Sequence, residues 1–240
     1  MFIIPCKYVE GCLILESVSA IRKYHPNVRI VVIDSDSSDK SYFSELKKID
    51  IVDVLDIANK HYESGAFWCV ARHTNAPFYV VMQDSIILKQ SLDKYLLDDE
   101  QFYAFINFNE DTLYNHMMNQ DGMTSNKYLT RLNEMLGGFG NLPMDLNINF
   151  TGVFGPSFIV KKNMVDKMLE NGLDKTMLPV VKFDHEITER AYGIIAQQCG
   201  VDVSKNTILG NLHDLKSKYM NGNVLVTNIL DKHWFANKRQ

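Results

Sequence analysis

The sequence predicts an α/β protein with a mostly parallel, twisted sheet flanked by helices, followed by an irregular C-terminal half. Two observations carry this prediction. Short β-branched runs alternate with helical patterns over the first hundred residues, and turn-forming residues bound each run. Apolar residues make up 46% of the 240 residues, which is enough for a packed core and too many for a disordered chain.

Four strands are expected in this regular part. They are short and apolar, as buried parallel strands are, and cover Phe2–Pro5, Val28–Ile33, Ile51–Leu55 and Phe78–Met82. Between them the spacing of apolar residues predicts helices from Leu13 to Tyr24, at Tyr42–Lys48 and at Ser64–His73. Strands separated by helices predict βαβ units, with helices covering both faces of the sheet.

The pattern loosens after a fifth expected strand at Phe102–Phe108. The remaining expectations are an amphipathic stretch over 128–136, a glycine-rich run over 137–140, two short strands within Asn149–Val160, helices at Lys161–Glu170 and Asp184–Gln198, and strands at Ile208–Leu212 and Val224–Ile229. Because no linker or repeat interrupts the chain, the prediction is one domain over 1–240, with a regular half (1–108) and an irregular half (109–240).

Charge and targeting features exclude several function classes. The 25 basic and 29 acidic residues give a net charge of −4, so no broad basic field draws the chain to nucleic acid. No apolar run reaches the roughly 18 residues that cross a bilayer, and the first residues lack the basic start of a secretion signal. A cytoplasmic protein is therefore expected, and its four cysteines are interpreted as reduced, mostly buried thiols.

The carboxyl ends of the second and fourth strands hold the candidate site, because parallel sheets bind ligands at such ends. Asp34-Ser35-Asp36-Ser37-Ser38-Asp39 could hold a ribose or a base, or could be a solvated, capped turn. It is not a calcium loop, since Asp39 occupies the position that needs glycine. Asp84 follows an apolar strand, where either a divalent metal bridging to a diphosphate or a turn-capping role would offset its desolvation.

These segments together resemble a GT-A glycosyltransferase, most closely the inverting family 2 type. The resemblance covers about residues 2–95 and rests on four ordered pieces: a first strand ending in proline, Asp34-Ser35-Asp36-Ser37-Ser38-Asp39 in place of a D-D-G-S-T-D-like segment, a helix containing Gly65-Ala66, and a strand closing on a D-x-D-like motif. It implies a Rossmann-like nucleotide-sugar half followed by an acceptor-binding half.

The resemblance also implies roles for individual residues. Pro5 and Asp34 would line the nucleoside pocket, and Asp36 would lie close to it. Gln83 and Asp84 match the last two positions of the D-x-D motif, where Asp84 would hold Mn²⁺ or Mg²⁺ against the diphosphate. Met82 replaces the first acid of the motif, so a second metal ligand would have to come from elsewhere.

The irregular half supplies further candidates. Asp184 or Glu186, in a segment that resembles the family's acidic motif, would remove the proton of the acceptor hydroxyl. Asp184 is favoured, because it begins the expected helix, where capping would hold it rigid; a helix cap with a solvated acidic face is the competing interpretation. His213 would be a late metal ligand or a structural histidine. Gly152 would allow close approach of a sugar or belong to a bulged strand pair. The tail cations Lys232, His233, Lys238 and Arg239 could close over a diphosphate or form a solvated end.

The sequence therefore favours a metal-dependent glycosyltransferase that moves a sugar from a nucleotide sugar, a UDP-sugar foremost, to a glycan or other hydroxyl acceptor with inversion. A non-catalytic binding module with a degenerate GT-A fold is the alternative, favoured by Met82. A sugar-1-phosphate nucleotidyltransferase fits less well, because residues 6–12 offer only Lys7 and Gly11 in place of its glycine-rich basic loop. The sequence indicates neither the sugar, the linkage nor the oligomeric state.

Overall fold

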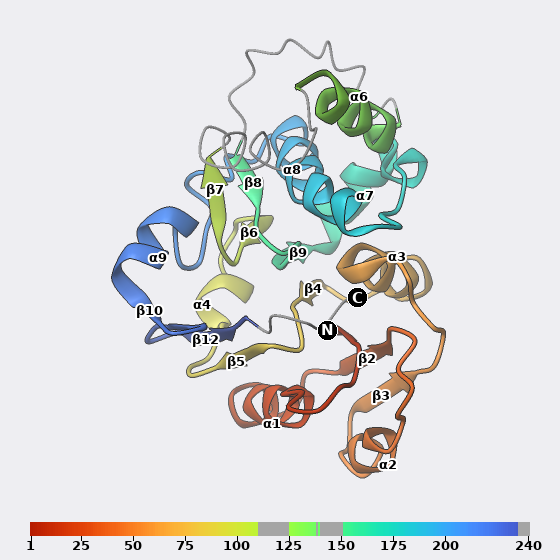
Figure 1. Cartoon of the computed structure of the whole chain (residues 1–240), viewed down its shortest axis with the longest axis vertical. Helices are drawn as coiled ribbons and strands as arrows, with labels where there is room; N and C mark the ends of the chain where they lie inside the picture. Colours follow the sequence, from red (N-terminus) through yellow and green to blue (C-terminus); the bar gives the residue numbers. More distant parts are fainter. Residues whose placement is uncertain (110–124, 138, 140–150, 235–240) are drawn as a thin grey trace. The chain divides into compact units, whose positions relative to one another are not determined.

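A computed structural model describes residues 1–109, 125–137, 139 and 151–234 of the chain (Figure 1). The chain divides into two compact units. Unit 1 consists of Met1–Asp98 together with Asp214–Gln240, and unit 2 consists of Asp99–His213. Each unit brings together segments that carry candidate functional residues.

Unit 1 contains the predicted parallel sheet. Its strands lie in the order β3-β2-β1-β4, and their bounds are β1 (Phe2–Cys6), β2 (Ile30–Asp34), β3 (Val52–Leu55) and β4 (Phe78–Val81). All three neighbouring pairs among these strands are parallel. The four predicted strands are therefore confirmed, with ends that shift by no more than two residues.

The two neighbours of β1 pair with it over different lengths. β2 pairs along the whole of β1, from Phe2 opposite Ile30 to Cys6 opposite Asp34. β4 pairs only with the first part of β1, where Phe2 and Ile3 lie opposite Val80 and Val81. β1 and β4 are therefore not paired with each other toward their carboxyl ends. This is the geometry of a ligand-binding switch point in an open α/β sheet.

Pro5 fits this separation. Its place in the middle of a sheet is unusual, because proline cannot donate to a neighbouring strand. The N–H groups of Val80 and Met82 donate to the carbonyls of Met1 and Ile3, so odd-numbered residues of β1 face β4. The nitrogen of Pro5 therefore faces the side on which pairing with β4 has already ended, and no ladder hydrogen bond is lost.

Three helices connect these strands, as predicted. They are α1 (Ile14–Tyr24), α2 (Tyr42–Leu46) and α3 (Tyr62–His73), and Figure 1 shows the strands between α3 on one side and α1 and α2 on the other. α1 buries Ile14, Val18 and Ile21, one stripe at the spacing of an amphipathic helix. α3 packs against β1 and β4.

A second, antiparallel sheet completes unit 1, in the order β10-β11-β12-β5. It joins β5 (Ile86–Leu88), which follows Asp84, to β10 (Met220–Asn221), β11 (Val224–Val226) and β12 (Leu230–His233); the short helix α4 (Asp93–Leu96) follows β5. The predicted strand Val224–Ile229 was too long. Thr227 ends it, because its hydroxyl and backbone bond to Leu230 and turn the chain into β12.

Unit 2 is built on short strands and longer helices. The strands β6 (Phe102–Ala104) and β9 (Phe158–Lys161) form one antiparallel pair, and β7 (Asn107–Asn109) and β8 (Thr151–Val153) form another. The helices are α6 (Ser125–Leu136), α7 (Lys162–Glu170), the 3₁₀ turn η2 (Leu173–Lys175) and α8 (Lys182–Gln198); α9 (Leu212–Tyr219) begins at the end of the unit. The expected strand Phe102–Phe108 is divided into β6 and β7.

One expected strand of unit 2 is wrong. Residues Ile208–Leu212 form no strand; isolated bridges lie at Asn211 and at the preceding Thr207, and Leu212 begins α9. Gly210 explains the difference, because its φ of 104° turns the chain out of extended geometry.

α8 lies very close to β8. A Cβ atom on Gly193 would come within 1.9 Å of the backbone oxygen of Thr151, so only glycine allows this contact. The space beside Gly152 is also occupied, because a Cβ atom there would lie 2.1 Å from the ring of Phe108. The close approach at Gly152 is therefore to the ring of Phe108 on the paired strand β7, and the pairing register at this position is regular.

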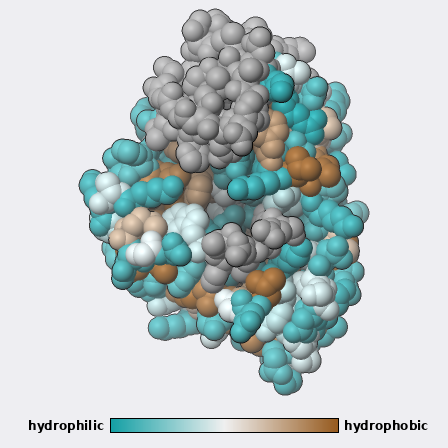
Figure 2. All heavy atoms as spheres, in the orientation of Figure 1, coloured by the Kyte–Doolittle hydropathy of each residue, from teal (hydrophilic) through white to brown (hydrophobic). Residues whose placement is uncertain are grey.

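The surface is largely polar. Figure 2 shows mainly hydrophilic residues on one face, with separated hydrophobic spots. Among the described residues, no helix has both the length and the apolar character needed to span a membrane.

Candidate functional site

The carboxyl ends of β1 and β4 bring together an acid and two thiols. Asp84, three residues beyond the end of β4, is 7% exposed, and Cys6 ends β1 in a fully buried position. The Cys12 thiol lies 3.7 Å from the sulfur of Cys6 and donates to Oδ2 of Asp84 at 3.7 Å. One ligand atom from each of the three residues lies within 4.8 Å of the others.

This group, called here the Cys6–Cys12–Asp84 cluster, is a candidate metal site. The role of Asp84 as a metal ligand stays a prediction, and its two neighbours in the cluster are thiols that the sequence predicted only as reduced, mostly buried residues. No metal identity follows from the arrangement by itself.

The two residues before Asp84 do not add a ligand to the cluster. Met82, at the position of the missing acid, is fully buried in the core. The side-chain amide of Gln83 donates to Oε1 of Glu63 at 2.8 Å. Glu63 is itself buried in the first turn of α3, so Gln83 connects the strand end to that helix.

Asp34 organises the loop that follows β2. It is fully buried, and its carboxylate accepts hydrogen bonds from the Tyr42 hydroxyl at 2.8 Å and from the backbone N–H of Ser37 at 3.2 Å. The ammonium of Lys40 lies 3.9 Å from the same carboxylate. These contacts satisfy a buried charge from inside the protein, so Asp34 shapes the loop after β2.

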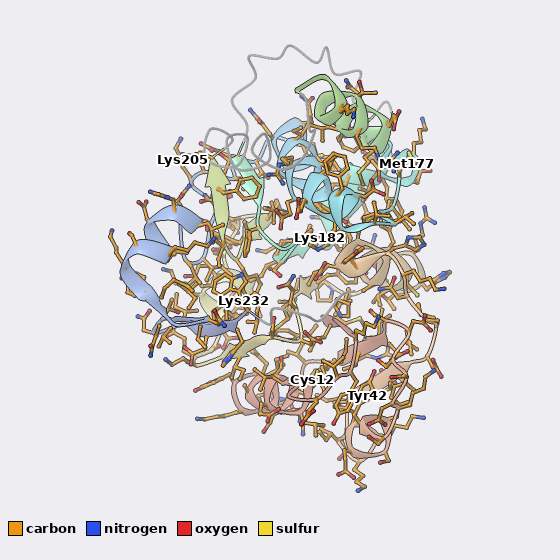
Figure 3. The ribbon with its side chains drawn as sticks, viewed as in Figure 1. Cys12, Tyr42, Met177, Lys182, Lys205 and Lys232 are labelled. Carbon is orange, nitrogen blue, oxygen red and sulfur yellow. The ribbon has the colours of Figure 1, made fainter. Side chains whose placement is uncertain are left out.

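An aromatic pair lies beside Asp34. The rings of Tyr8 and Tyr42 stack with centroids 4.6 Å apart and planes inclined by 10°. Tyr42 is buried, and burial, followed by nearby negative charge, raises the pKa of its hydroxyl above its ordinary value, so it stays a hydrogen-bond donor. The backbone N–H of Tyr8 donates to the Ser37 hydroxyl at 2.8 Å, which fixes the loop after β1 to the loop after β2. Figure 3 labels Tyr42 and Cys12, which belong to the same unit.

Asp36 differs from Asp34 in its exposure and its backbone conformation. It is exposed, with its carboxylate 3.9 Å from the ammonium of Lys60. Its φ of 63° places a non-glycine residue in the left-handed region, a conformation that costs energy and concentrates at ligand-binding loops.

A buried lysine contacts Ser85, the residue that follows Asp84 in the sequence. Lys232 on β12 is 6% exposed, and its ammonium donates to the hydroxyl of Ser85 at 2.5 Å (Figure 3). The backbone of His233 also bonds to the carbonyl of Ser85. Of the four tail cations considered from the sequence, Lys232 and His233 thus belong to the sheet of unit 1, whereas Lys238 and Arg239 lie outside the described residues.

In unit 2, Asp184 is held in an ion pair. Nε and Nη2 of Arg131 donate to its two oxygens at 2.8 and 3.0 Å, and the backbone N–H of Val180 donates to it at 3.1 Å. Burial opposes the charge of Asp184, but the hydrogen bonds outweigh burial, so the pKa of Asp184 lies below its ordinary value. A carboxylate with a lowered pKa is a weaker proton acceptor.

Two other acids lie further along α8. The carboxylate of Glu186 is partly exposed and lies 3.8 Å from the ammonium of Lys182. Glu189 is buried and accepts from the backbone N–H of Gly155 at 2.8 Å; its burial raises its pKa, which the neighbouring Arg190 opposes. Glu189 therefore acts in holding the turn at Gly155.

The remaining sequence candidates have simple surroundings. His213 is exposed at the start of α9, where its backbone N–H bonds to Oδ1 of Asn211. Pro5 lies at the separation of β1 and β4. Asn149 and Phe150, at the start of an expected strand, lie outside the described residues.

Sequence analysis missed Cys6, Cys12 and Tyr8 as site residues. A usable signal was present for Cys6, because it ends the strand next to the one that precedes Asp84 in a sheet of this class. No local pattern marks Cys12 or Tyr8, which reach the site only through the path of the loop between β1 and α1.

Comparison with known proteins finds similarity only to solved structures, at low sequence identity. No protein-family model and no curated protein matches the sequence. Among solved structures, the chain is similar to S. aureus TarS 1-349, determined alone and in complex with UDP, at 13% identity and a TM-score of 0.45, covering 80% of this chain and 54% of that one.

A second similar structure is the mannosyltransferase PcManGT from Pyrobaculum calidifontis in complex with GDP-Man and Mn²⁺. It has 19% identity and a TM-score of 0.36, with 48% of this chain and 36% of that one covered. The chain thus spans about half the length of the TarS structure. At these TM-scores the fold assignment rests on the chain's own topology, a parallel α/β sheet flanked by helices.

Proposed function

We propose that the chain is a glycosyltransferase that uses a nucleotide sugar, a UDP-sugar foremost, with unit 1 as the donor-binding part. The single observation that supports this most is the set of polar and aromatic side chains at the carboxyl ends of β1, β2 and β4. Ligands of open α/β sheets bind at such ends, where the strand order reverses. The GT-A resemblance of residues 2–95 supplies the class of ligand.

Each of these side chains has a different role in donor binding. The partly exposed ring of Tyr8, which stacks on buried Tyr42, offers an aromatic surface for a base, and Asp34 holds the loop that carries Tyr42. Pro5 lies where β1 and β4 separate, and Asp36 lies on an exposed turn after β2 with a positive φ. Lys232 provides a buried positive charge beside Ser85, suited to the negative charge that a departing diphosphate gains.

The donor atoms at Asp84 bear on the expected Mn²⁺ or Mg²⁺. Both ions prefer oxygen ligands, whereas two of the three candidate ligand atoms in the cluster are sulfur. The cluster fits Mn²⁺ or Mg²⁺ poorly. We therefore assign the neutralisation of the diphosphate charge to Lys232, and we assign no step of the transfer to such an ion. His213 remains a predicted ligand.

In unit 2, Glu186 is the better candidate for the base. The oxygen of the acceptor hydroxyl would attack the anomeric carbon while its proton passes to the Glu186 carboxylate. The bond from the anomeric carbon to the diphosphate breaks, and its electron pair leaves with the diphosphate, which inverts the anomeric centre. Asp184 suits this role less, because Arg131 holds its proton affinity down.

Binding and turnover can be tested separately. The chain is screened by thermal shift against UDP, GDP, CDP, dTDP and their sugars, and a ligand at 100 times its Kd adds about 2.7 kcal/mol, or roughly 5–10 °C. Release of free sugar from the bound donor is then followed by chromatography. We expect a shift with one nucleotide family, slow donor hydrolysis, and loss of the shift in Lys232→Met.

Lys89→Met is the matched control, because Lys89 also lies beside this sheet but pairs with Asp231 on the exposed side, at 3.2 Å. No shift with any nucleotide, or equal loss in both lysine variants, would contradict the donor-binding proposal.

A second candidate function is a binding module that holds a nucleotide sugar or glycan without turnover. The burial of Met82 at the place of an acid, and the ion pair that engages Asp184, favour it. A nucleotide shift with no donor hydrolysis and no transfer to any of a panel of glycans would select this function over the enzyme.

A further inference from the structure

We propose that Cys6, Cys12 and Asp84 form a binding site for a thiophilic divalent cation of the zinc class. The inference goes beyond the proposed function and does not depend on it, because it concerns which ion these side chains select. It rests on the convergence of two sulfur atoms and one carboxylate at the point where β1 and β4 separate.

Two of the three spacings between the ligand atoms match tetrahedral zinc, and the third lies within 4.8 Å. Two sulfurs at about 2.3 Å from a tetrahedral ion lie about 3.8 Å apart, and a sulfur and a carboxylate oxygen lie about 3.6 Å apart. The structure has 3.7 Å between the sulfurs of Cys6 and Cys12, and 3.7 Å between the Cys12 sulfur and Oδ2 of Asp84. The three atoms can therefore face one ion with small side-chain movements.

The surroundings also suit an ion that is bound from solution. Cys6 and Asp84 are buried and stand at or just beyond strand ends, which hold them in position, whereas Cys12 is partly exposed on the loop before α1. Binding replaces the thiol protons of Cys6 and Cys12, which pass to the buffer, and both sulfurs bind as thiolates. Three protein ligands leave the fourth position to a water molecule or another external oxygen, as in zinc sites that are not purely structural.

The ligand set predicts selectivity. Thiolates favour zinc, cobalt and cadmium over magnesium, which requires oxygen ligands in octahedral geometry. Magnesium at a large excess should therefore leave a bound thiophilic ion in place.

Cobalt titration tests the site in the full chain. Purified protein, reduced and freed of metal, is titrated with Co²⁺, and the thiolate-to-cobalt charge-transfer absorption is followed. We expect one Co²⁺ per chain, displacement by one equivalent of Zn²⁺, and no displacement by a 100-fold excess of Mg²⁺. Circular dichroism of each variant checks that it is folded.

Variants identify the ligands. Cys6→Ser and Cys12→Ser should each weaken Co²⁺ binding at least tenfold and lower the charge-transfer absorption, and Asp84→Asn should weaken binding while keeping the absorption per bound ion. Cys69→Ser is the matched control, a partly exposed cysteine on α3 outside the cluster, and should bind as the unchanged chain does.

Three results would overturn the site. They are the absence of a one-to-one cobalt complex in folded protein, equal binding in Cys12→Ser and the unchanged chain, and displacement by magnesium. A Cys6–Cys12 disulfide that persists under the reductant would also overturn it, and titration of free thiols detects this. Failure of nucleotide binding in the thermal-shift screen leaves these readouts unchanged, so the two proposals fail separately.

Discussion

The ion pair between Asp184 and Arg131 allows a structural role to be separated from a catalytic one. Asp184→Asn keeps the shape of the side chain but removes the charge that two guanidinium N–H groups and the backbone N–H of Val180 bind. The partly buried Arg131 charge then lacks its main counterion, so the variant should unfold at a lower temperature than the unchanged chain.

The magnitude follows from exposure. The side chain of Asp184 is 3% exposed and that of Arg131 is 26% exposed. Breaking a buried pair costs about 3–5 kcal/mol, whereas a surface pair contributes about 0–1 kcal/mol. An intermediate loss of about 2 kcal/mol is expected, which lowers Tm by about 4–8 °C for a chain of this size.

Thermal unfolding followed by circular dichroism at neutral pH measures this loss. The matched control is Glu134→Gln, because Glu134 bonds to the same guanidinium at 2.9 Å but is 52% exposed, so Tm should change by no more than about 2 °C. An unchanged Tm for Asp184→Asn, or a larger loss for Glu134→Gln, would refute the reasoning.

The difference in Tm between Asp184→Asn and the unchanged chain should also depend on pH. Because the pKa of Asp184 is lowered in the folded protein, the pair stabilises the fold above the unfolded pKa of about 4 and loses this effect as pH falls through the folded pKa. The Tm values of Asp184→Asn and the unchanged chain should therefore converge at strongly acidic pH.

Three further predictions concern the fold. Gly193→Ala should destabilise unit 2 by about 1–3 kcal/mol despite better helix propensity, since the new methyl group meets the carbonyl of Thr151, and urea unfolding would measure it. Tyr42→Phe should cost about 1–3 kcal/mol by removing a donor from buried Asp34; unchanged urea unfolding would show that this hydrogen bond contributes nothing. Burial lowers the pKa of His25, against the pull of a nearby aspartate, so its neutral form stabilises the fold; stability should fall as pH drops from about 6.5 toward the folded pKa, and a His25→Gln variant should show a shallower fall in unfolding experiments at stepwise pH.

The sheet could be predicted because its signal is local. Buried parallel strands are continuous apolar runs, so β1 to β4 were visible without knowledge of their neighbours. The strand expected at Ile208–Leu212 shows the limit of this signal. Only isolated bridges form there, at Thr207 and Asn211, and the backbone conformation of Gly210, which apolar content does not reveal, decides the outcome.

The candidate site depends on contacts between distant residues, and these could be predicted only in part. Asp84 was found because an acid after an apolar strand is conspicuous by itself. Its neighbours Cys6 and Cys12 lie more than seventy residues earlier, and only the adjacency of β1 and β4 brings them together. The partner of Asp184 is likewise 53 residues away, so its ion pair left no trace in the local sequence.

Pro5 makes the opening between β1 and β4 difficult to close by strand pairing. Pairing with β4 ends before Pro5, so the proline breaks no existing ladder bond. Because proline carries no hydrogen to donate toward β4, the ladder cannot be extended by a bond from this position. The gap is therefore preorganised: it exists before any ligand arrives, and no binding energy is consumed in prying the strands open.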